Sequence, residues 1–126
     1  MAQTKEVKNL FPLTLVAPGG TKAAPVAAGV GLPLDVTGMS IGSTLSMRVK
    51  NSGSAPGAPG RLTVQHSTDG GATWFDVANI AGTTTADDEV TMSTVLPRGY
   101  KTLRALAYDN ITNGVSFEAV VVSVTD

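Results

Sequence analysis

The sequence predicts an all-β protein, a single antiparallel β-sandwich of seven or eight strands with a jelly-roll or an immunoglobulin-like topology. Three observations support this prediction. Several short segments alternate apolar and polar residues with the period of two that a half-buried strand requires. Turn-forming residues recur roughly every 8 to 15 positions. No segment has the 3.6-residue period of an amphipathic helix. Short strands at this spacing build sandwiches, and periodicity leaves both topologies open.

The N-terminal third divides into an arm, a strand and an irregular segment. Residues 1–9 are polar and are expected to form an arm that either frays or becomes ordered on a partner. Residues 10–17 predict the first strand, which Pro18-Gly19-Gly20 ends. Residues 21–35 have no clear period, and their two prolines forbid a long helix. The domain organisation expected is therefore an arm at 1–9 and a single sandwich domain at 10–126.

A strand and a loop follow. Residues 43–50 predict a half-buried strand with a cationic outer face, in which the apolar positions are Leu45, Met47 and Val49. Residues 51–60, with the sequence NSGSAPGAPG, contain no apolar anchor. This composition predicts an exposed loop that is mobile until a neighbour orders it.

The segment Arg61–Ile80 predicts two strands joined by a tight turn. Leu62, Val64 and His66 alternate with polar residues before the turn, and an apolar run resumes after it. The turn matches the Asp-box pattern, and its structural residues are Ser67, Asp69, Gly71, Thr73 and Trp74.

Each type of residue in this turn has a local structural role. The Asp69 carboxylate can accept bonds from backbone N–H groups, and the glycines can adopt positive φ. The motif resembles the structural hairpin lock of sialidases and other Asp-box proteins. We interpret it as a lock; the alternative is that the edge of Trp74, or Asp69 itself, contacts a ligand.

Three further strands are expected, at residues 89–96, 100–108 and 115–125. The second carries apolar residues on both faces, which predicts a central position in its sheet. The third is a nearly continuous apolar run, which predicts cover on both sides. Glu118 interrupts this run, beside Arg104 or at a subunit contact.

Composition excludes several classes of function. The net charge of −1 argues against nucleic acid, because phosphate binding needs a clustered excess of cations. There is no cysteine, so neither a disulfide framework nor a thiolate metal site is possible. No apolar run reaches the roughly 20 residues of a membrane helix. Only 15% of residues are charged, against about a quarter in typical domains, which suits a protein packed against a partner.

The sequence offers no catalytic set, so we expect no enzyme activity. His66 is the only histidine and lies on the apolar face of its strand, where a packed imidazole is expected rather than a base or a ligand. Asp69 and Asp76 flank a turn in which Asp69 already has a role. The run Asp87-Asp88-Glu89 lacks the alternate spacing of a calcium loop. No metal, cofactor or nucleotide site is expected.

The order of the segments resembles the small capsid cement, or decoration, proteins of tailed bacteriophages. The resemblance covers residues 43–126. It rests on the strand at 43–50, the Gly- and Ser-rich loop, the hairpin, the segment LPRGYKTLRA at 96–105 and the Val-rich terminal strand.

This resemblance implies a structural virion protein, made in the host cytoplasm, that decorates the capsid exterior and stabilises it by bridging neighbouring capsid subunits. The implied partners are the major capsid protein and other copies of the chain in a homo-oligomer, with no nucleic acid, membrane or cofactor. The candidate partner contacts lie in the arm and the loop, at Lys5, Lys8, Asn51, Ser54, Pro56 and Pro59.

Two other functions remain open. A carbohydrate-binding or adhesion β-sandwich module would use Trp74, Phe75 and Tyr108 as stacking surfaces. A phage tail or baseplate structural protein would use a similar sandwich. Exposure separates a sugar site from a decoration protein, because a sugar needs an open aromatic ring beside polar groups.

Overall fold

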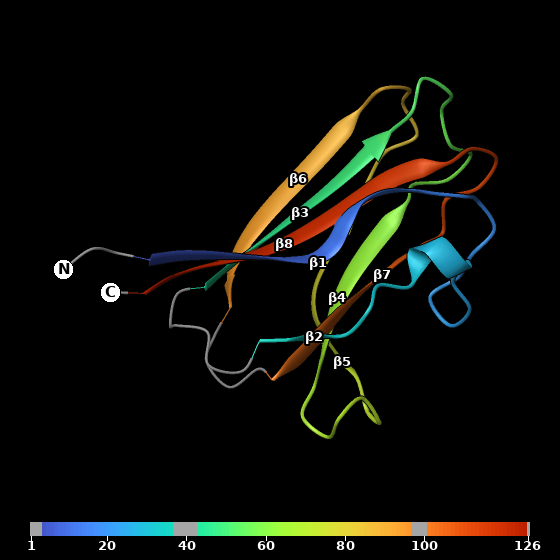
Figure 1. Ribbon diagram of the computed structural model, residues 1–126. Coiled ribbons are helices and arrows are strands. Elements are labelled where there is room, and N and C mark those ends of the chain that lie inside the picture. Colours follow the sequence, from blue (N-terminus) through green and yellow to red (C-terminus); the bar gives the residue numbers. More distant parts are fainter. Residues whose placement is uncertain (1–3, 37–42, 97–100, 126) are drawn as a thin grey trace.

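The computed structural model describes residues 4–36, 43–96 and 101–125. These residues form eight strands and one short 3-10 helix (Figure 1). In chain order the elements are β1 (Thr4–Val16), η1 (Ala27–Gly29), β2 (Leu34–Asp35), β3 (Ser43–Asn51), β4 (Arg61–Ser67), β5 (Phe75–Ala81), β6 (Glu89–Leu96), β7 (Thr102–Tyr108) and β8 (Val115–Thr125).

The strands form two four-stranded antiparallel sheets with jelly-roll topology. The first sheet has the order β1-β8-β3-β6, and the second has the order β2-β7-β4-β5. Thus β1 pairs with β8, β2 with β7, β3 with β6 and β4 with β5. The first half of the chain therefore runs antiparallel to the second half as one long hairpin, rolled into a sandwich. The predicted sandwich is confirmed, and this strand order selects the jelly roll from the two topologies.

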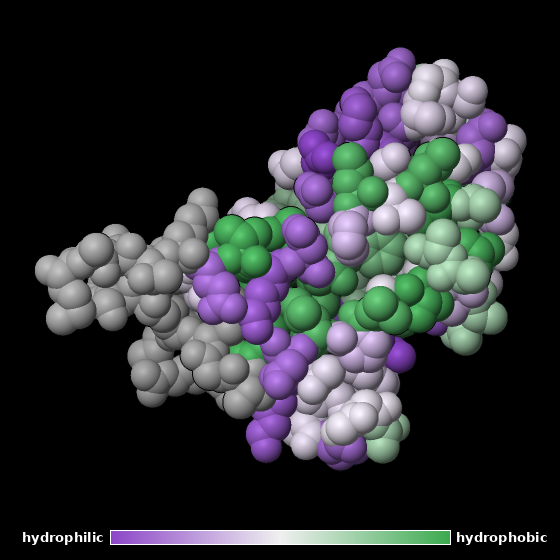
Figure 2. All heavy atoms as spheres, viewed as in Figure 1, coloured by the Kyte–Doolittle hydropathy of each residue, from purple (hydrophilic) through white to green (hydrophobic). Residues whose placement is uncertain are grey.

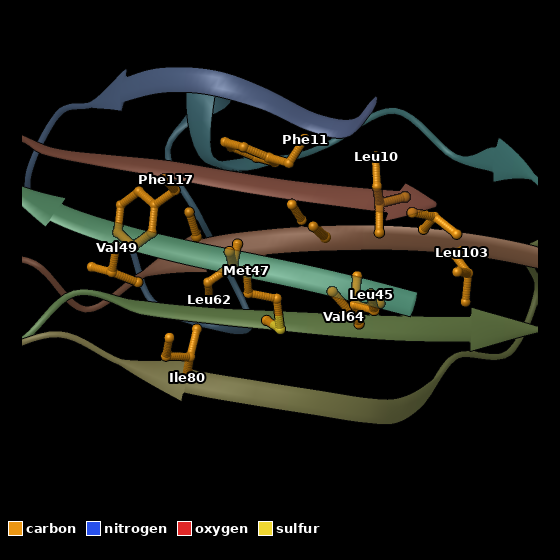
Figure 3. Close-up of a cluster of buried hydrophobic side chains, with 14 of the residues drawn as sticks. Leu10, Phe11, Leu45, Met47, Val49, Leu62, Val64, Ile80, Leu103 and Phe117 are labelled. Carbon is orange, nitrogen blue, oxygen red and sulfur yellow. The ribbon is translucent and has the colours of Figure 1, made fainter. Parts of the chain in front are cut away.

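The core lies between the two sheets and follows from the period of two. Along β3 every second residue is buried. Figure 3 shows Leu45, Met47 and Phe117 from the first sheet packed with Leu62 and Val64 from the second. Phe117 has no exposed surface and is the largest fully buried side chain in the described residues. The other labelled members of the cluster are Leu10, Phe11, Val49, Ile80 and Leu103.

The strands expected from alternation are present. The hairpin is formed by β4 and β5. In β6, Val90, Met92 and Thr94 are half-buried, whereas the residues between them are exposed. β7 is central in its sheet, between β2 and β4, as its two apolar faces predicted.

The prediction of a free arm at residues 1–9 is wrong for residues 4–9. These residues are the first half of β1, and they pair with β8 from Thr4↔Thr125 to Asn9↔Val120. The terminal strand β8 is long, and its C-terminal residues, 120–125, pair with this polar segment through backbone hydrogen bonds. Such pairing needs no apolar pattern. Residues 1–3 lie outside the described part of the chain.

The loop at residues 51–60 is ordered by the chain itself, which corrects the expectation that a neighbour orders it. The N–H of Gly57 donates to the carbonyl of Ile111 at 2.7 Å, and the carbonyl of Gly60 accepts from Gly82 at 2.8 Å. A Cβ at Gly60 would lie 2.7 Å from the Phe117 ring, so the loop backbone packs directly on the core. A loop of Ser, Gly, Ala and Pro without a large apolar side chain thus still closes one end of the sandwich.

The outer face of β8 is only half-buried, which corrects the expectation of cover on both sides. Val115, Phe117, Ala119 and Val121 face the core, whereas Val120 and its outward neighbours are partly exposed. Glu118 lies on this outer face, 3.6 Å from Arg48 Nε on β3. It is therefore paired with Arg48 and not with Arg104.

Candidate functional site

The Asp-box turn between β4 and β5 is closed by its own hydrogen bonds. Ser67 Oγ donates to Asp69 Oδ1 at 2.7 Å and accepts from the N–H of Gly71 at 2.9 Å. The N–H of Thr73 donates to Asp69 Oδ1 at 2.9 Å. Gly70 and Gly71 have φ of 76° and 96°, where a side chain would be strained. This network satisfies the motif without any ligand.

These bonds also hold Asp69 in its ionised form. The hydrogen bond from Ser67, followed by the bonds from Thr73, lowers the pKa of Asp69 from its ordinary value of 3.8 to about 2. Because the pKa is lower in the folded state, the carboxylate stabilises the fold above about pH 3.8. That contribution is lost as the pH falls toward 2.

We expect Asp69→Ala to lower the melting temperature at pH 7, because the Ser67 hydroxyl and the Thr73 N–H lose their shared acceptor. The difference in melting temperature between wild type and variant should become smaller as the pH falls from 3.8 to 2. Circular dichroism melts across this range measure both effects. Thr68→Ala, at an exposed position of the same turn, is the matched control. A gap that is absent at pH 7, or that does not change with pH, contradicts the proposed lock.

A chain of polar contacts lies beside this turn and ends at Trp74. Lys22 Nζ is 2.6 Å from Asp76 Oδ2, and Gln65 Nε2 donates to Asp76 Oδ1 at 3.0 Å. Arg104 Nε donates to Gln65 Oε1 at 2.9 Å, and its guanidinium lies 4.2 Å from the centre of the Trp74 ring. The bond from Lys22, and then that from Gln65, lowers the pKa of Asp76, whereas burial lowers the pKa of Arg104. The polar atoms already satisfy one another.

The three aromatic candidates for sugar stacking are placed differently. Trp74 is half-buried and is stacked by Arg104. Tyr108 is buried, and its hydroxyl is 2.8 Å from Thr63 Oγ1. Phe75 is 55% exposed and packs against His66, with 5.5 Å between ring centroids. Only Phe75 of the three presents a largely exposed ring, and the described residues place no second open ring beside it.

A second surface is the outer side of the first sheet, where apolar and hydroxyl side chains form rows across four strands. In one row Val7 lies opposite Val122, Val122 opposite Thr44, and Thr44 opposite Val95. Val7 is 53% and Val95 is 65% exposed. The next row contains Asn9, Val120, Ser46 and Ser93. We call these two rows the valine face; its members are Val7, Asn9, Thr44, Ser46, Ser93, Val95, Val120 and Val122.

The valine face carries no ionisable side chain, and its hydroxyls are partly satisfied. Ser46 Oγ and Ser93 Oγ are 3.1 Å apart, which is hydrogen-bond distance. A shallow hollow of about 470 Å³ at its β6 side is lined by Thr44, Ser93, Thr94 and Val95. Such a surface can be covered without burying an unpaired charge.

Charged residues gather at the other end of the same sheet. Arg48 lies 3.7 Å from Glu89 and 3.6 Å from Glu118, across three adjacent strands. In Figure 2, strongly hydrophilic residues lie at the top of the view, over β6 and the adjoining loops. Hydrophobic residues lie lower in the view, and further hydrophilic residues lie beside them over β1. The valine face and these ion pairs therefore occupy different parts of the same sheet.

The residues predicted as partner contacts are mostly used within the chain. Asn51 is 2% exposed, and its Nδ2 donates to the carbonyls of Thr83 and Thr85 at 2.9 and 2.8 Å. Lys8 Nζ donates to the carbonyl of Asp35 at 3.0 Å, which ties β1 to β2.

The remaining predicted contacts are divided between the surface and the interior. Pro56 is buried, Ser54 is exposed and Pro59 is half-buried. The side chain of Lys5 lies outside the described part of the structure. Of the five predicted residues whose side chains are described, Ser54 and Pro59 make no side-chain hydrogen bond within the described residues and are at least partly exposed, so a partner can reach them most directly.

Neither a metal cluster nor a membrane-spanning helix is found in the described residues. No group of three His, Cys, Asp or Glu side chains in residues 4–36, 43–96 and 101–125 could hold a metal ion. In the same ranges no helix is long and apolar enough to cross a membrane.

The fold and these surfaces define a jelly-roll β-sandwich, and comparison with known proteins gives its structural relatives. No family model and no curated protein sequence matches the chain. It is similar in structure to the K3 cleaved adhesin domain of Lys-gingipain from Porphyromonas gingivalis, with a TM-score of 0.55 and 14% identity over 88% of this chain and 72% of that chain.

It is also similar to a chain of infectious bursal disease virus, Gx strain, with a TM-score of 0.50 and 12% identity. That match covers 97% of this chain and 32% of the viral chain, so the protein spans about a third of it. A family 16 carbohydrate-binding module overlaps it less well, with a TM-score of 0.44 and 16% identity over 92% of this chain and 86% of that chain. At these identities the likeness shows the fold alone.

Proposed function

We propose that this chain is a non-catalytic binding module of the adhesion class, which docks on a protein surface through the valine face. The observation that carries the proposal is the uncharged pair of rows on the first sheet, with Val7 and Val95 largely exposed. Burial of apolar surface contributes about 25 cal/mol per Å². The structural similarity to an adhesin domain supports a binding module as the class of protein. The way in which this chain would bind is argued from its own surface residues.

The two ends of the sheet face fit the anatomy of a protein interface. Protein interfaces usually have an apolar, charge-depleted centre and a polar rim. The valine face supplies the centre, and the ion pairs of Arg48 with Glu89 and Glu118 supply the rim. Because the Ser46 and Ser93 hydroxyls already contact each other, covering them leaves less hydrogen-bonding capacity unmet.

We propose further that the protein surface on which the valine face docks is the capsid of a tailed bacteriophage. The resemblance of residues 43–126 to capsid decoration proteins supports a capsid as the partner, as does the low content of charged residues. The major capsid protein is then the partner, and the protein is located on the capsid exterior. A tail or baseplate location would use the same face.

A carbohydrate-binding function is the competing member of the same class. It requires an open ring beside polar groups, whereas Tyr108 is buried and Arg104 stacks on Trp74. Phe75 is the exposed ring, so the glycan hypothesis depends on it. This difference makes the two functions separable by mutation.

We expect Val95→Asp to reduce occupancy of the intact chain on purified capsid shells at least tenfold, about 1.4 kcal/mol, because an unpaired carboxylate would be buried at the contact. Co-sedimentation and cryo-electron microscopy measure the occupancy. Leu32→Asp is the control, since Leu32 is 84% exposed and lies outside the valine face.

Three results decide between the functions. Equal loss in Val95→Asp and Leu32→Asp, or no loss in either, contradicts docking through the valine face. No binding of the wild-type chain to shells contradicts the capsid form. Binding on a glycan array that disappears in Phe75→Ala would instead establish the carbohydrate function.

A further inference from the structure

Three of the four sheet edges carry features that prevent pairing with another strand. The edges are β1 and β6 in the first sheet and β2 and β5 in the second. β1 contains Pro12, charged residues and two register shifts. β2 is two residues long. β5 carries Asp76 and has a bulge, since Val64 and Gln65 pair with Ala78 and Asp76 and leave Val77 extra. Shortness, charge, proline and bulges are the usual ways in which proteins block edge pairing.

β6 has only one of these features, a charge at its first residue, Glu89. It pairs with β3 over eight residues, from Glu89↔Lys50 to Leu96↔Ser43, without a register shift. After Glu89 the strand reads VTMSTVL, with no charge and no proline. On the side away from β3 it pairs with no strand in the described part of the chain. That side is therefore a regular row of backbone donors and acceptors, which an added strand can satisfy.

The flank of the sandwich at β6 is also incompletely covered. Val90 and Met92 pack against the core but remain half-buried. Across the sandwich β6 faces the edge strand β5, on which Val77 and Ala78 are likewise only partly buried. An added strand beside β6 would cover apolar surface here as well as pairing the backbone.

We propose that the partner on this edge is a second copy of the chain, whose β6 pairs antiparallel with β6 about a two-fold axis at Met92. In this register Met92 faces its own copy, Val90 faces Thr94 and Thr91 faces Ser93 of the second copy. Glu89 faces Val95, and the two Glu89 side chains are about 20 Å apart, so no like charges meet. β6 is therefore complementary to itself, as a two-fold interface requires.

The pairing would join two first sheets into one continuous sheet of eight strands. The two valine faces would then lie on the same side of that sheet. Two weak contacts made at once gain from effective concentration, so the dimer would hold a repetitive surface more tightly than the monomer. The dimer itself is independent of the proposed function, and its tests need no capsid or glycan.

The absence of cysteine makes a cross-linking test clean. Directly opposed Cβ atoms in an antiparallel pair are about 4.5–5.5 Å apart, within reach of a disulfide after small adjustment. We expect Met92→Cys, under mild oxidation in the full chain, to give a covalent dimer as the main product. Asn79→Cys, on the edge strand β5, should give only background. Equal yields from the two variants would overturn the pairing.

Light scattering of the wild-type chain tests the same interface without a cross-link. We expect a concentration-dependent dimer, and we expect Thr91→Lys combined with Ser93→Lys to raise its Kd at least tenfold by placing like charges opposite each other. Asn79→Lys should leave the Kd unchanged, and thermal melts verify that each variant is folded. A wild-type chain that remains monomeric up to about 1 mM would overturn the proposal.

Discussion

Phe117→Ala is expected to lower the free energy of unfolding by about 3–5 kcal/mol, the usual cost of truncating a buried phenylalanine. Phe117 has no exposed surface and lies between the sheets among Met47, Val49 and Leu62 (Figure 3). Its ring also contacts the loop backbone, since a Cβ at Gly60 would approach it to 2.7 Å. The backbone on that side is held by the Gly82–Gly60 bond, so the cavity cannot close easily.

Urea unfolding measures this loss as a lower midpoint at unchanged slope. Phe75→Ala removes the same side chain from a position that is 55% exposed, and it serves as the matched control. It should cost far less, because little packing is lost. Similar costs for the two variants would contradict the described core, with Phe117 at its centre.

The elements that sequence predicts well are those defined by local signals. The alternation of Leu45, Met47 and Val49 is sufficient for β3, because one buried face imposes the period of two. The Asp box is similar: Ser67 and Asp69 bond within the turn, two residues apart. No distant residue is needed to specify either feature.

The features that sequence missed depend on distant pairing. Residues 4–9 become a strand because β8 extends far enough to pair with them, and nothing in their own pattern shows this. Asn51 was expected at the surface, yet its amide binds the loop around Thr83 and Thr85. A composition of Ser, Gly and Pro predicts irregular backbone, and it does not show whether the chain itself orders that backbone.

The candidate surfaces could not be predicted from the sequence either, because they combine residues that are distant along the chain. Lys22 and Asp76 are 54 residues apart and meet only after the sandwich has formed. The valine face combines Val7, Val95 and Val122 from three strands, and each valine alone resembles a core residue. Alternation shows which residues share a face, whereas the strand order that assembles the rows is a property of the jelly roll.

Gly29→Ala is expected to detach the segment of residues 27–36, which packs along β7 of the second sheet. Gly29 ends η1, and a Cβ there would lie 2.3 Å from the carbonyl oxygen of Ala107 on β7. Because the obstacle is backbone in a central strand, the glycine segment must move instead, at a cost of about 1–3 kcal/mol or more. The bond from the N–H of Gly31 to the carbonyl of Ala105, 2.8 Å in the native fold, should weaken with it.

Hydrogen exchange at the Gly31 amide, together with a thermal melt, measures both effects of Gly29→Ala. We expect faster exchange at Gly31 and a lower melting temperature. Gly53→Ala is the matched control, because the nearest atom to its added Cβ is Asp87 Oδ1 at 3.9 Å, an ordinary contact. Unchanged protection of Gly31 in Gly29→Ala would mean that the segment does not approach β7 as closely as described. A loss of protection confined to residues 27–36 would instead show that this segment opens separately from the rest of the sandwich.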